Sequence, residues 1–255
     1  MRLLFFGDVV GESGVEFLKK NIFKLKKEYS ADITIVNGEN SAKGNGISPA
    51  SFGELVRLGA DVVTTGNHCF RRRDVEELYA ENEILLRPAN YPDGVVGRGY
   101  TVLDLGRARV AVVNLMGIVY LEALDNPFSV IDRLLGEIDT KNIIVDLHAE
   151  ATSEKKALGQ YLDGRVTAVL GTHTHVQTAD EIVLPGGTAY ITDVGMTGPE
   201  LSVLGVESSI AIEKLRMHTP VTFRESKNPC FLNAVCVDFN ESTGRANSIE
   251  RIIIR

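Results

Sequence analysis

Metal-ligating side chains recur at one kind of position in this chain, directly after short apolar runs rich in β-forming residues. Four of the five histidines lie in three such motifs, which read Gly66-Asn67-His68, Asp146-Leu147-His148 and Gly171-Thr172-His173-Thr174-His175. Two carboxylates, Asp8 and Glu39, follow other apolar runs in the same way. The carboxyl ends of strands in an α/β sheet share one edge, where ligands bind. The pattern therefore predicts that these side chains converge on one pocket, where they could hold metal ions.

Strand and helix patterns alternate along the chain, which indicates an α/β fold. We expect strands at 2–6, 32–36, 61–64, 84–86, 100–105, 109–114, 142–147, 166–170, 181–184, 188–192, 231–239 and 249–254. Helical spacing or start signals predict helices at about 15–29, 49–56, 74–81, 128–138 and 152–162. No repeat or linker interrupts the pattern, so the 255 residues are predicted to form one domain, 1–255.

Composition limits the classes of partner. The net charge of −7 disfavours stable binding to duplex nucleic acid or to an anionic membrane, and no apolar stretch reaches membrane-spanning length. A small phosphorylated substrate stays compatible, because a metal ion would supply local positive charge. Three cysteines without metal-finger spacing favour a reduced, cytoplasmic protein. The first ten residues are expected to form a buried strand rather than a signal segment.

The motifs together resemble those of a known superfamily. Gly-Asp at 7–8, Gly-Glu-Asn at 38–40, Gly-Asn-His at 66–68, the single His148 and Gly-Thr-His-Thr-His at 171–175 resemble the five blocks of the calcineurin-like metallophosphoesterases. The stretches DVVGESG, VNGENSAKGNGIS, LHAEATSEK, GTHTHVQTAD and TDVGMTGP are similar to the bacterial YmdB-type 2′,3′-cyclic-nucleotide phosphodiesterases. Val10 and Glu39 stand where the superfamily usually has histidine and aspartate, and the narrower family shares both departures. The resemblance implies a sandwich of two mixed β-sheets flanked by helices, with the active site at the strand carboxyl ends.

The resemblance also implies residue roles. One metal ion would be held by Asp8, Glu39, Asn40 and His175. The second would be held by Glu39, Asn67, His148 and His173, so that Glu39 bridges the two. His68 would be the catalytic acid, and no substrate-binding residue is assigned. Carboxylate, amide and imidazole ligands without thiolate favour Fe or Mn, with Zn as the alternative.

The implied reaction is hydrolysis of a 2′,3′-cyclic nucleotide to a 3′-phosphate. Two ions about 3.5–4 Å apart would clamp the phosphate and lower the pKa of a bridging water to about 7. The resulting hydroxide would attack phosphorus in line, and His68 would protonate the departing ribose oxygen. Two alternatives are a broad phosphomonoesterase or nucleotidase with the same centre, and a slow-turnover regulatory protein that senses nucleotides or RNA. The resemblance further implies a homo-oligomer.

Several of these residues also have a simpler structural interpretation. Asp8 would serve as the N-cap of the following helix, and Asn40 would stabilise a turn in a glycine-rich loop. His68 and His148 would be ordinary hydrogen-bonded histidines. The convergence of the motifs at one edge favours the functional interpretation for all four. The neighbouring glycines are expected to permit tight turns, namely Gly7, Gly38, Gly66 and Gly171.

Segments beside the motifs leave further alternatives open. Glu150 and Thr152 would either orient ligands or cap the next helix. The run at 71–73, Arg71-Arg72-Arg73, would gather phosphate or, as we favour, begin a solvated helix. The loop Lys43-Gly44-Asn45-Gly46 lacks the spacing of a P-loop and is expected to form a flexible pocket wall.

Overall fold

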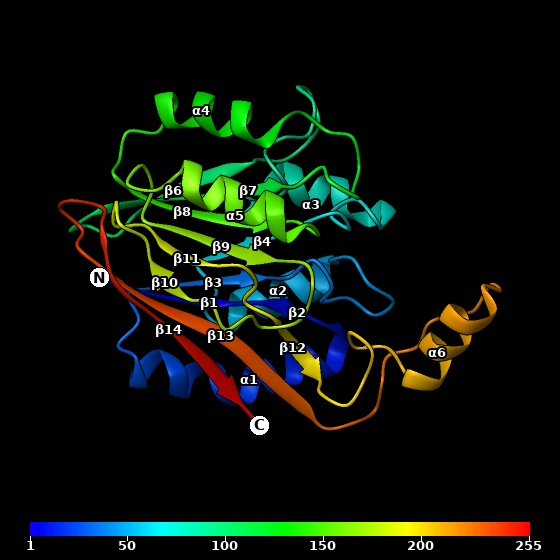
Figure 1. Cartoon of the computed structure of the whole chain (residues 1–255). Helices are drawn as coiled ribbons and strands as arrows, with labels where there is room; N and C mark the ends of the chain where they lie inside the picture. The colour runs from blue at the N-terminus through cyan, green and yellow to red at the C-terminus, as the bar shows by residue number, and fades with distance from the viewer.

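The first strand explains why this sequence forms two layers of sheet. In β1 (Arg2–Phe6), Leu4 and Phe6 pack among the side chains of the neighbouring helices, whereas Leu3 and Phe5 pack into a second core. Successive side chains of a strand point to opposite faces, so a continuous apolar run buries both faces. That second core also contains Val110 and other residues of a different sheet. The computed structural model describes residues 1–255, and in it two sheets stack with helices outside them (Figure 1).

The larger sheet has eight strands and is mixed. Its order is β2 (Asp8–Val9), β12 (Met196–Pro199), β13 (Cys230–Phe239), β1, β3 (Ile33–Asn37), β4 (Val62–Thr64) and β5 (Leu85–Leu86), and β14 (Ala246–Ile254) pairs with β13. β1, β3, β4 and β5 run parallel, so their carboxyl ends lie at one edge. β13 is antiparallel to β1 and β14.

The smaller sheet has six strands and is also mixed. Its order is β10 (Ile182–Val183), β11 (Ala189–Ile191), β9 (Ala168–Thr172), β8 (Asn142–His148), β7 (Arg109–Met116) and β6 (Tyr100–Asp104). The four inner strands are parallel, and the two edge strands are antiparallel to their neighbours. The two mixed sheets confirm the predicted fold.

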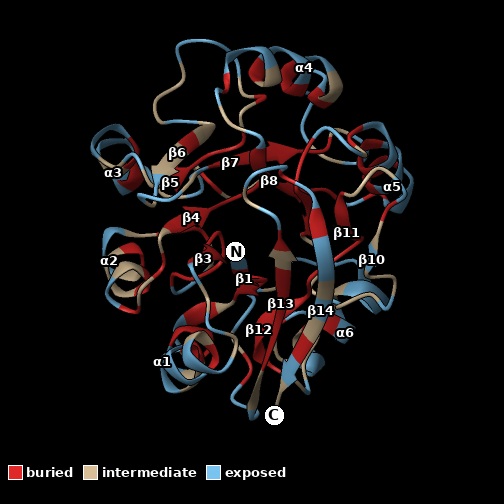
Figure 2. Ribbon diagram, turned by 90° about the vertical axis from the view of Figure 1, so that its left-hand side faces the viewer, coloured by how far each residue is buried: buried red, intermediate tan, exposed pale blue.

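Helices cover both outer faces, and buried residues concentrate on the strands between them (Figure 2). The larger sheet is covered by α1 (Gly11–Glu28), α2 (Pro49–Arg57), the 3-10 turn η1 (Arg73–Val75) and α3 (Glu76–Glu81). The smaller sheet is covered by α4 (Pro127–Glu137) and α5 (Thr152–Tyr161). Side chains mark the starts of two helices, because Ser48 forms a capping box before α2 and Asn126 accepts from the amides of Phe128 and Ser129 at the start of α4.

The sequence analysis did not predict β2, β12 or α6 (Ser208–Met217). The helix α6 lies apart from the stacked layers (Figure 1), and Ala211 is its only buried residue. It has no apolar stripe directed into a core and no side-chain cap at its N-terminus, so the signals that mark the other helices are missing. None of the helices combines the length and apolar character needed to cross a membrane.

Candidate metal centre

The predicted ligands meet at the carboxyl ends of strands from both sheets. The larger sheet supplies the segments after β1, β3 and β4, which carry Asp8, Glu39, Asn40, Asn67 and His68. The smaller sheet supplies the end of β8 and the segment after β9, which carry His148, His173 and His175. The expected convergence is therefore present, but it occurs where two sheets adjoin and not along the edge of one sheet.

Glu39 lies at the centre of this cluster. Its buried carboxylate places Oε2 3.3 Å from His148 Nε2. Its Oε1 lies 3.0 Å from Asn40 Nδ2 and 3.2 Å from His68 Nδ1. The ligand atoms of Glu39, His148 and His173 all lie within 4.8 Å of one another. One carboxylate thus touches residues from both of the predicted ligand groups.

The remaining predicted ligands lie on either side of Glu39. On one side, His175 Nε2 is 3.7 Å from Asp8 Oδ1 and 3.3 Å from Asn40 Nδ2. On the other, Asn67 Oδ1 is 3.0 Å from His148 Nε2. Asn40 turns its nitrogen toward His175, so ligation through its oxygen requires a half-turn of the amide.

The donor set fits a divalent cation. Asp8 Oδ1 is buried and has no hydrogen-bond partner, and a buried carboxylate without a countercharge is costly. The imidazoles of His148 and His173 direct nitrogen atoms at each other, with Nε2 and Nδ1 3.0 Å apart. A cation in the cluster would balance the carboxylate charge and accept the lone pairs of the imidazole nitrogens. Oxygen and imidazole ligands of this kind bind Fe, Mn and Zn.

A buried carboxylate that the sequence analysis did not single out supports His148. Thr172 Oγ1 lies 2.9 Å from His148 Nδ1 and donates to Asp146 Oδ1 at 2.7 Å. Asn37 Nδ2 donates to the other oxygen of Asp146 at 3.0 Å. The Nδ1 side of His148 is thereby anchored and its Nε2 faces the cluster, an arrangement that orients metal-binding histidines.

His173 and His175 are anchored in the same manner. Glu150 Oε2 lies 3.1 Å from His173 Nε2, so Glu150 contacts a predicted ligand. The Leu204 carbonyl lies 3.3 Å from His175 Nδ1. Thr152 is exposed and makes no side-chain hydrogen bond, while Ala151 is the N-cap of α5, so neither Glu150 nor Thr152 caps that helix. Of these two residues, only Glu150 is in a position to orient a proposed ligand, His173.

The electrostatics of the cluster follow from its burial. Burial lowers the pKa of His148, but the carboxylates of Glu39, Asp8 and Asp146 raise it overall, to about 9. Burial, reinforced by the charge of His148, lowers the pKa of His173 to about 3. Burial would raise the pKa of Glu39, but His148 and His68 hold it well below its usual range. Because a ligating imidazole must be neutral, a cation competes with a proton at His148.

Two expectations from the sequence are wrong. The N-cap of α1 is Val10, so Asp8 does not cap that helix. The glycines beside the motifs do not adopt positive φ, so tight-turn freedom is not their role. A Cβ at Gly66 would overlap with His148 and Glu39, which means that this glycine allows the segment after β4 to approach the cluster.

His68 lies at the mouth of the cluster, with 28% of its side chain exposed. Its Nδ1 faces Glu39 and Asn40, and its Nε2 lies 3.5 Å from Asn45 Nδ2 in the loop at 43–46. That loop also packs against Arg71, so it forms a wall beside His68. Arg71 and Arg73 are exposed where η1 begins, in agreement with the favoured interpretation of a solvated helix start.

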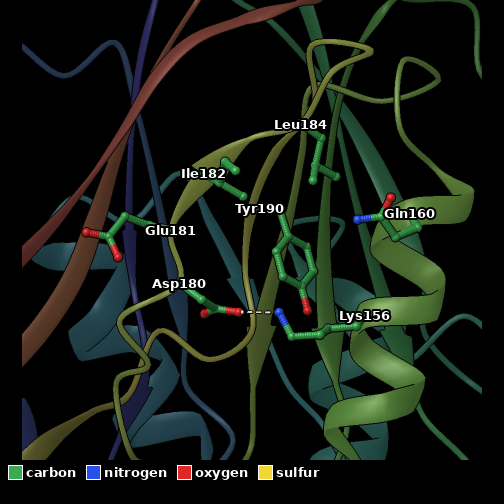
Figure 3. Close-up of a pocket in the computed structure, with 7 residues that line it drawn as sticks. All are labelled: Lys156, Gln160, Asp180, Glu181, Ile182, Leu184 and Tyr190. Carbon is green, nitrogen blue, oxygen red and sulfur yellow. Dashed lines mark hydrogen bonds and ion pairs between the residues drawn. The ribbon is translucent and has the colours of Figure 1, made fainter.

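A separate hollow of about 390 Å³ lies between α5, the edge strand β10 and its neighbour β11 (Figure 3). Lys156 and Asp180 form an ion pair across it at 2.8 Å. Its lining consists of Lys156, Gln160, Asp180, Glu181, Ile182, Leu184 and Tyr190, none of which is a predicted ligand. The hollow is therefore distinct from the candidate metal centre.

The fold is the one found in calcineurin-like phosphoesterases. The calcineurin-like phosphoesterase YfkN from Bacillus subtilis shares this fold, with a TM-score of 0.61 at 10% identity over 100% of this chain and 90% of that chain. A family model described as YmdB-like protein matches residues 4–252, and the chain belongs to this family. The predicted family is thereby confirmed, and relatives named as a phosphodiesterase and a phosphatase confirm the predicted enzyme class.

Individual relatives cover nearly the whole chain. A 2′,3′-cyclic-nucleotide 2′-phosphodiesterase of Bacillus subtilis (strain 168) is 45% identical over 256 residues, which span 100% of this chain and 97% of that protein. The crystal structure of a hypothetical protein from Thermus thermophilus superposes with a TM-score of 0.94 at 41% identity, covering 99% and 98% of the two chains. A novel phosphatase from Mycoplasma pneumoniae gives a TM-score of 0.95 at 35% identity, covering 100% and 93%.

Proposed function

We propose that this protein is a binuclear-metal-dependent phosphodiesterase that hydrolyses 2′,3′-cyclic nucleotides to 3′-phosphates. The observation that carries the proposal is the position of Glu39, whose carboxylate contacts His148 on one side and Asn40 on the other. One residue can therefore belong to two ligand groups. The B. subtilis relative, which is named for the 2′-bond of the same substrate, supports the reaction.

In this proposal the chain holds two cations. One group consists of Asp8, Glu39, Asn40 and His175, and the other consists of Glu39, Asn67, His148 and His173. Bound cations would polarise the phosphoryl group and activate a water molecule for attack. Fe or Mn suits the oxygen and imidazole donors best, with Zn as the alternative.

His68 supplies the proton for the leaving group. Its Nδ1 faces the Glu39 carboxylate, so its Nε2 is the atom available at the mouth of the cluster. The attacking water releases one proton to solvent as its oxygen bonds to phosphorus, and the bond from phosphorus to the ribose 2′ oxygen breaks. The 2′ oxygen takes the proton from Nε2, and the phosphate stays on the 3′ oxygen. Proton donation by a positioned histidine is suited to reactions near neutral pH.

The proposal also covers the size of the substrate, the oligomeric state and the cellular location. The substrate is a small nucleotide, because the net charge of −7 disfavours stable duplex binding. The chain acts as one domain, and the family resemblance supports a homo-oligomer. All three cysteines are free thiols, which supports a reducing cytoplasmic location.

The proposal is tested by metal removal and product analysis. Chelation should abolish hydrolysis of 2′,3′-cyclic AMP, and Mn²⁺ or Fe²⁺ should restore it. Phosphorus NMR should identify adenosine 3′-phosphate as the product. The variant His218→Ala, which changes an exposed histidine outside the centre, should behave like the parent protein. Full activity after demetallation, or release of the 2′-phosphate, would contradict the proposal.

A further inference from the structure

Tyr120 combines an exposed aromatic ring with a strained backbone. It lies in the connection between β7 and α4, the residue is 87% exposed, and its φ is 65°. A left-handed conformation is unfavourable for a residue with a Cβ. The buried carboxylate of Glu154 accepts hydrogen bonds from the amides of Ile118 and Val119, at 2.9 and 3.3 Å. The two residues before Tyr120 are thereby tethered, and the ring is held out into solvent.

One end of the connection contacts a proposed ligand, and the other end reaches the segment after His68 through Tyr91. At one end, the Gly117 amide donates to the carbonyl of the proposed ligand His148 at 3.0 Å. Three steps of about 3.8 Å separate Gly117 from Tyr120, so their Cα atoms lie within about 11 Å of each other. At the other end, Glu122 accepts from the Tyr91 hydroxyl at 3.3 Å. The Tyr91 ring packs edge-on against Phe70, two residues beyond His68, with centroids 5.4 Å apart.

These constraints place the Tyr120 backbone close to the rim of the centre, on the connection between the end of β8 and the segment that carries His68. A flat aromatic face in this position suits the nucleobase, which the metal centre would not hold. We propose that Tyr120 is a stacking platform for the nucleobase of the substrate, an inference that rests on the proposed function. Every base has a π face, so such a platform binds nucleosides with little choice among bases.

The absence of tryptophan from the chain permits a direct binding test. Tyr120→Trp would introduce a single tryptophan, whose emission should be quenched when adenosine 3′-phosphate is added to the Mn²⁺-loaded protein. Inorganic phosphate should leave the emission unchanged. The control is Phe23→Trp, at an aromatic residue in the second half of α1 that is 59% exposed, and its emission should respond to neither compound. No quenching of Tyr120→Trp at saturating nucleotide would overturn the inference.

Steady-state kinetics give a second test. Tyr120→Ala should raise KM for 2′,3′-cyclic AMP roughly 5- to 150-fold, the range expected for one lost base stack, with kcat nearly unchanged. Tyr120→Phe should restore the parental KM. On the 2′,3′-cyclic phosphate of methyl riboside, which has no base, Tyr120→Ala should equal the parent.

The outcomes separate this inference from the proposed function. Equal effects of Tyr120→Ala on the two substrates would overturn the stacking platform while hydrolysis itself persists. A changed oligomeric mass with an unchanged KM would also overturn it and would make Tyr120 a contact between copies. Quenching by adenosine 3′-phosphate without any hydrolysis of the cyclic substrate would support the base contact and refute the proposed reaction.

Discussion

Lys155 and Asp193 form an ion pair inside the protein, with Nζ 2.6 Å from Oδ2 and both side chains almost fully enclosed. The same Oδ2 accepts a hydrogen bond from the Thr174 amide at 3.0 Å. Thr174 lies between His173 and His175, whose φ values are 102° and 64°. Such conformations cost about 1–3 kcal/mol each and persist only where the surroundings impose them. The ion pair therefore fixes the backbone between two proposed ligands.

Replacing the lysine should be costly. Lys155→Met leaves the Asp193 charge buried without a partner, so we expect the free energy of unfolding to fall by about 3–5 kcal/mol. Metal content should fall as well, because the strained histidines lose their support. Urea unfolding measures the first effect and elemental analysis the second.

The adjacent lysine provides the control. Lys156 pairs with Asp180, but its side chain is 55% exposed, and pairs at the surface contribute about 0–1 kcal/mol. Lys156→Met should therefore have a small effect on unfolding and none on metal content. Similar losses in the two variants would show that the buried pair does not support the histidine segment.

The support of His148 can be tested by an isosteric change. Thr172→Val removes the hydroxyl that links His148 to Asp146, and the loss of such an outer hydrogen bond should weaken metal binding about 10–100-fold. Thr34→Val is the matched control, because Thr34 is also buried in a strand but its hydroxyl has no partner. Titration of Mn²⁺ into each protein measures the affinity. Indistinguishable affinities for the two variants would refute the orienting role of Thr172.

The sequence predicts which polar side chains of the site directly follow a strand. A polar residue directly after an apolar, β-rich run marks the end of a strand, and this signal located Asp8, Glu39, Asn67 and His148. Local sequence patterns do not predict how the strands group into two sheets, because strand pairing depends on contacts between distant segments. That expectation came from the family resemblance, and the structure confirms it.

The supporting residues could not be found from sequence for the same reason. The Asp146 carboxylate accepts hydrogen bonds from side chains of β3, β4 and β9, which are far apart in the chain. Lys155 and Lys156 are adjacent lysines of one helix, yet one is fully buried and the other is exposed. Only the three-dimensional position of Asp193 distinguishes them. The motif containing Asp193 was recognised, but its role was not.

Changes at Glu39 and His175 should affect the two metal ions differently. Glu39→Gln removes the charge that both proposed ligand groups share, so both ions should be lost together. His175→Ala removes a ligand from one group, so about one ion per chain should remain. Elemental analysis after gel filtration gives the ratio of metal to protein for each variant. The same stoichiometry in both would contradict a bridging role for Glu39.

The last prediction concerns His68, because it separates proton donation from metal binding. A ribose alkoxide is a poor leaving group, so His68→Ala should slow hydrolysis of 2′,3′-cyclic AMP by about 10²–10⁴, the usual contribution of general acid catalysis. A p-nitrophenolate leaves without a proton, so hydrolysis of bis-p-nitrophenyl phosphate should be much less affected. The two rates are compared at matched metal content, so that a disturbed centre cannot account for the difference. If the variant instead loses the same fraction of activity on both substrates, His68 does not donate the proton and serves only to position Glu39 and Asn40 through its contacts with them.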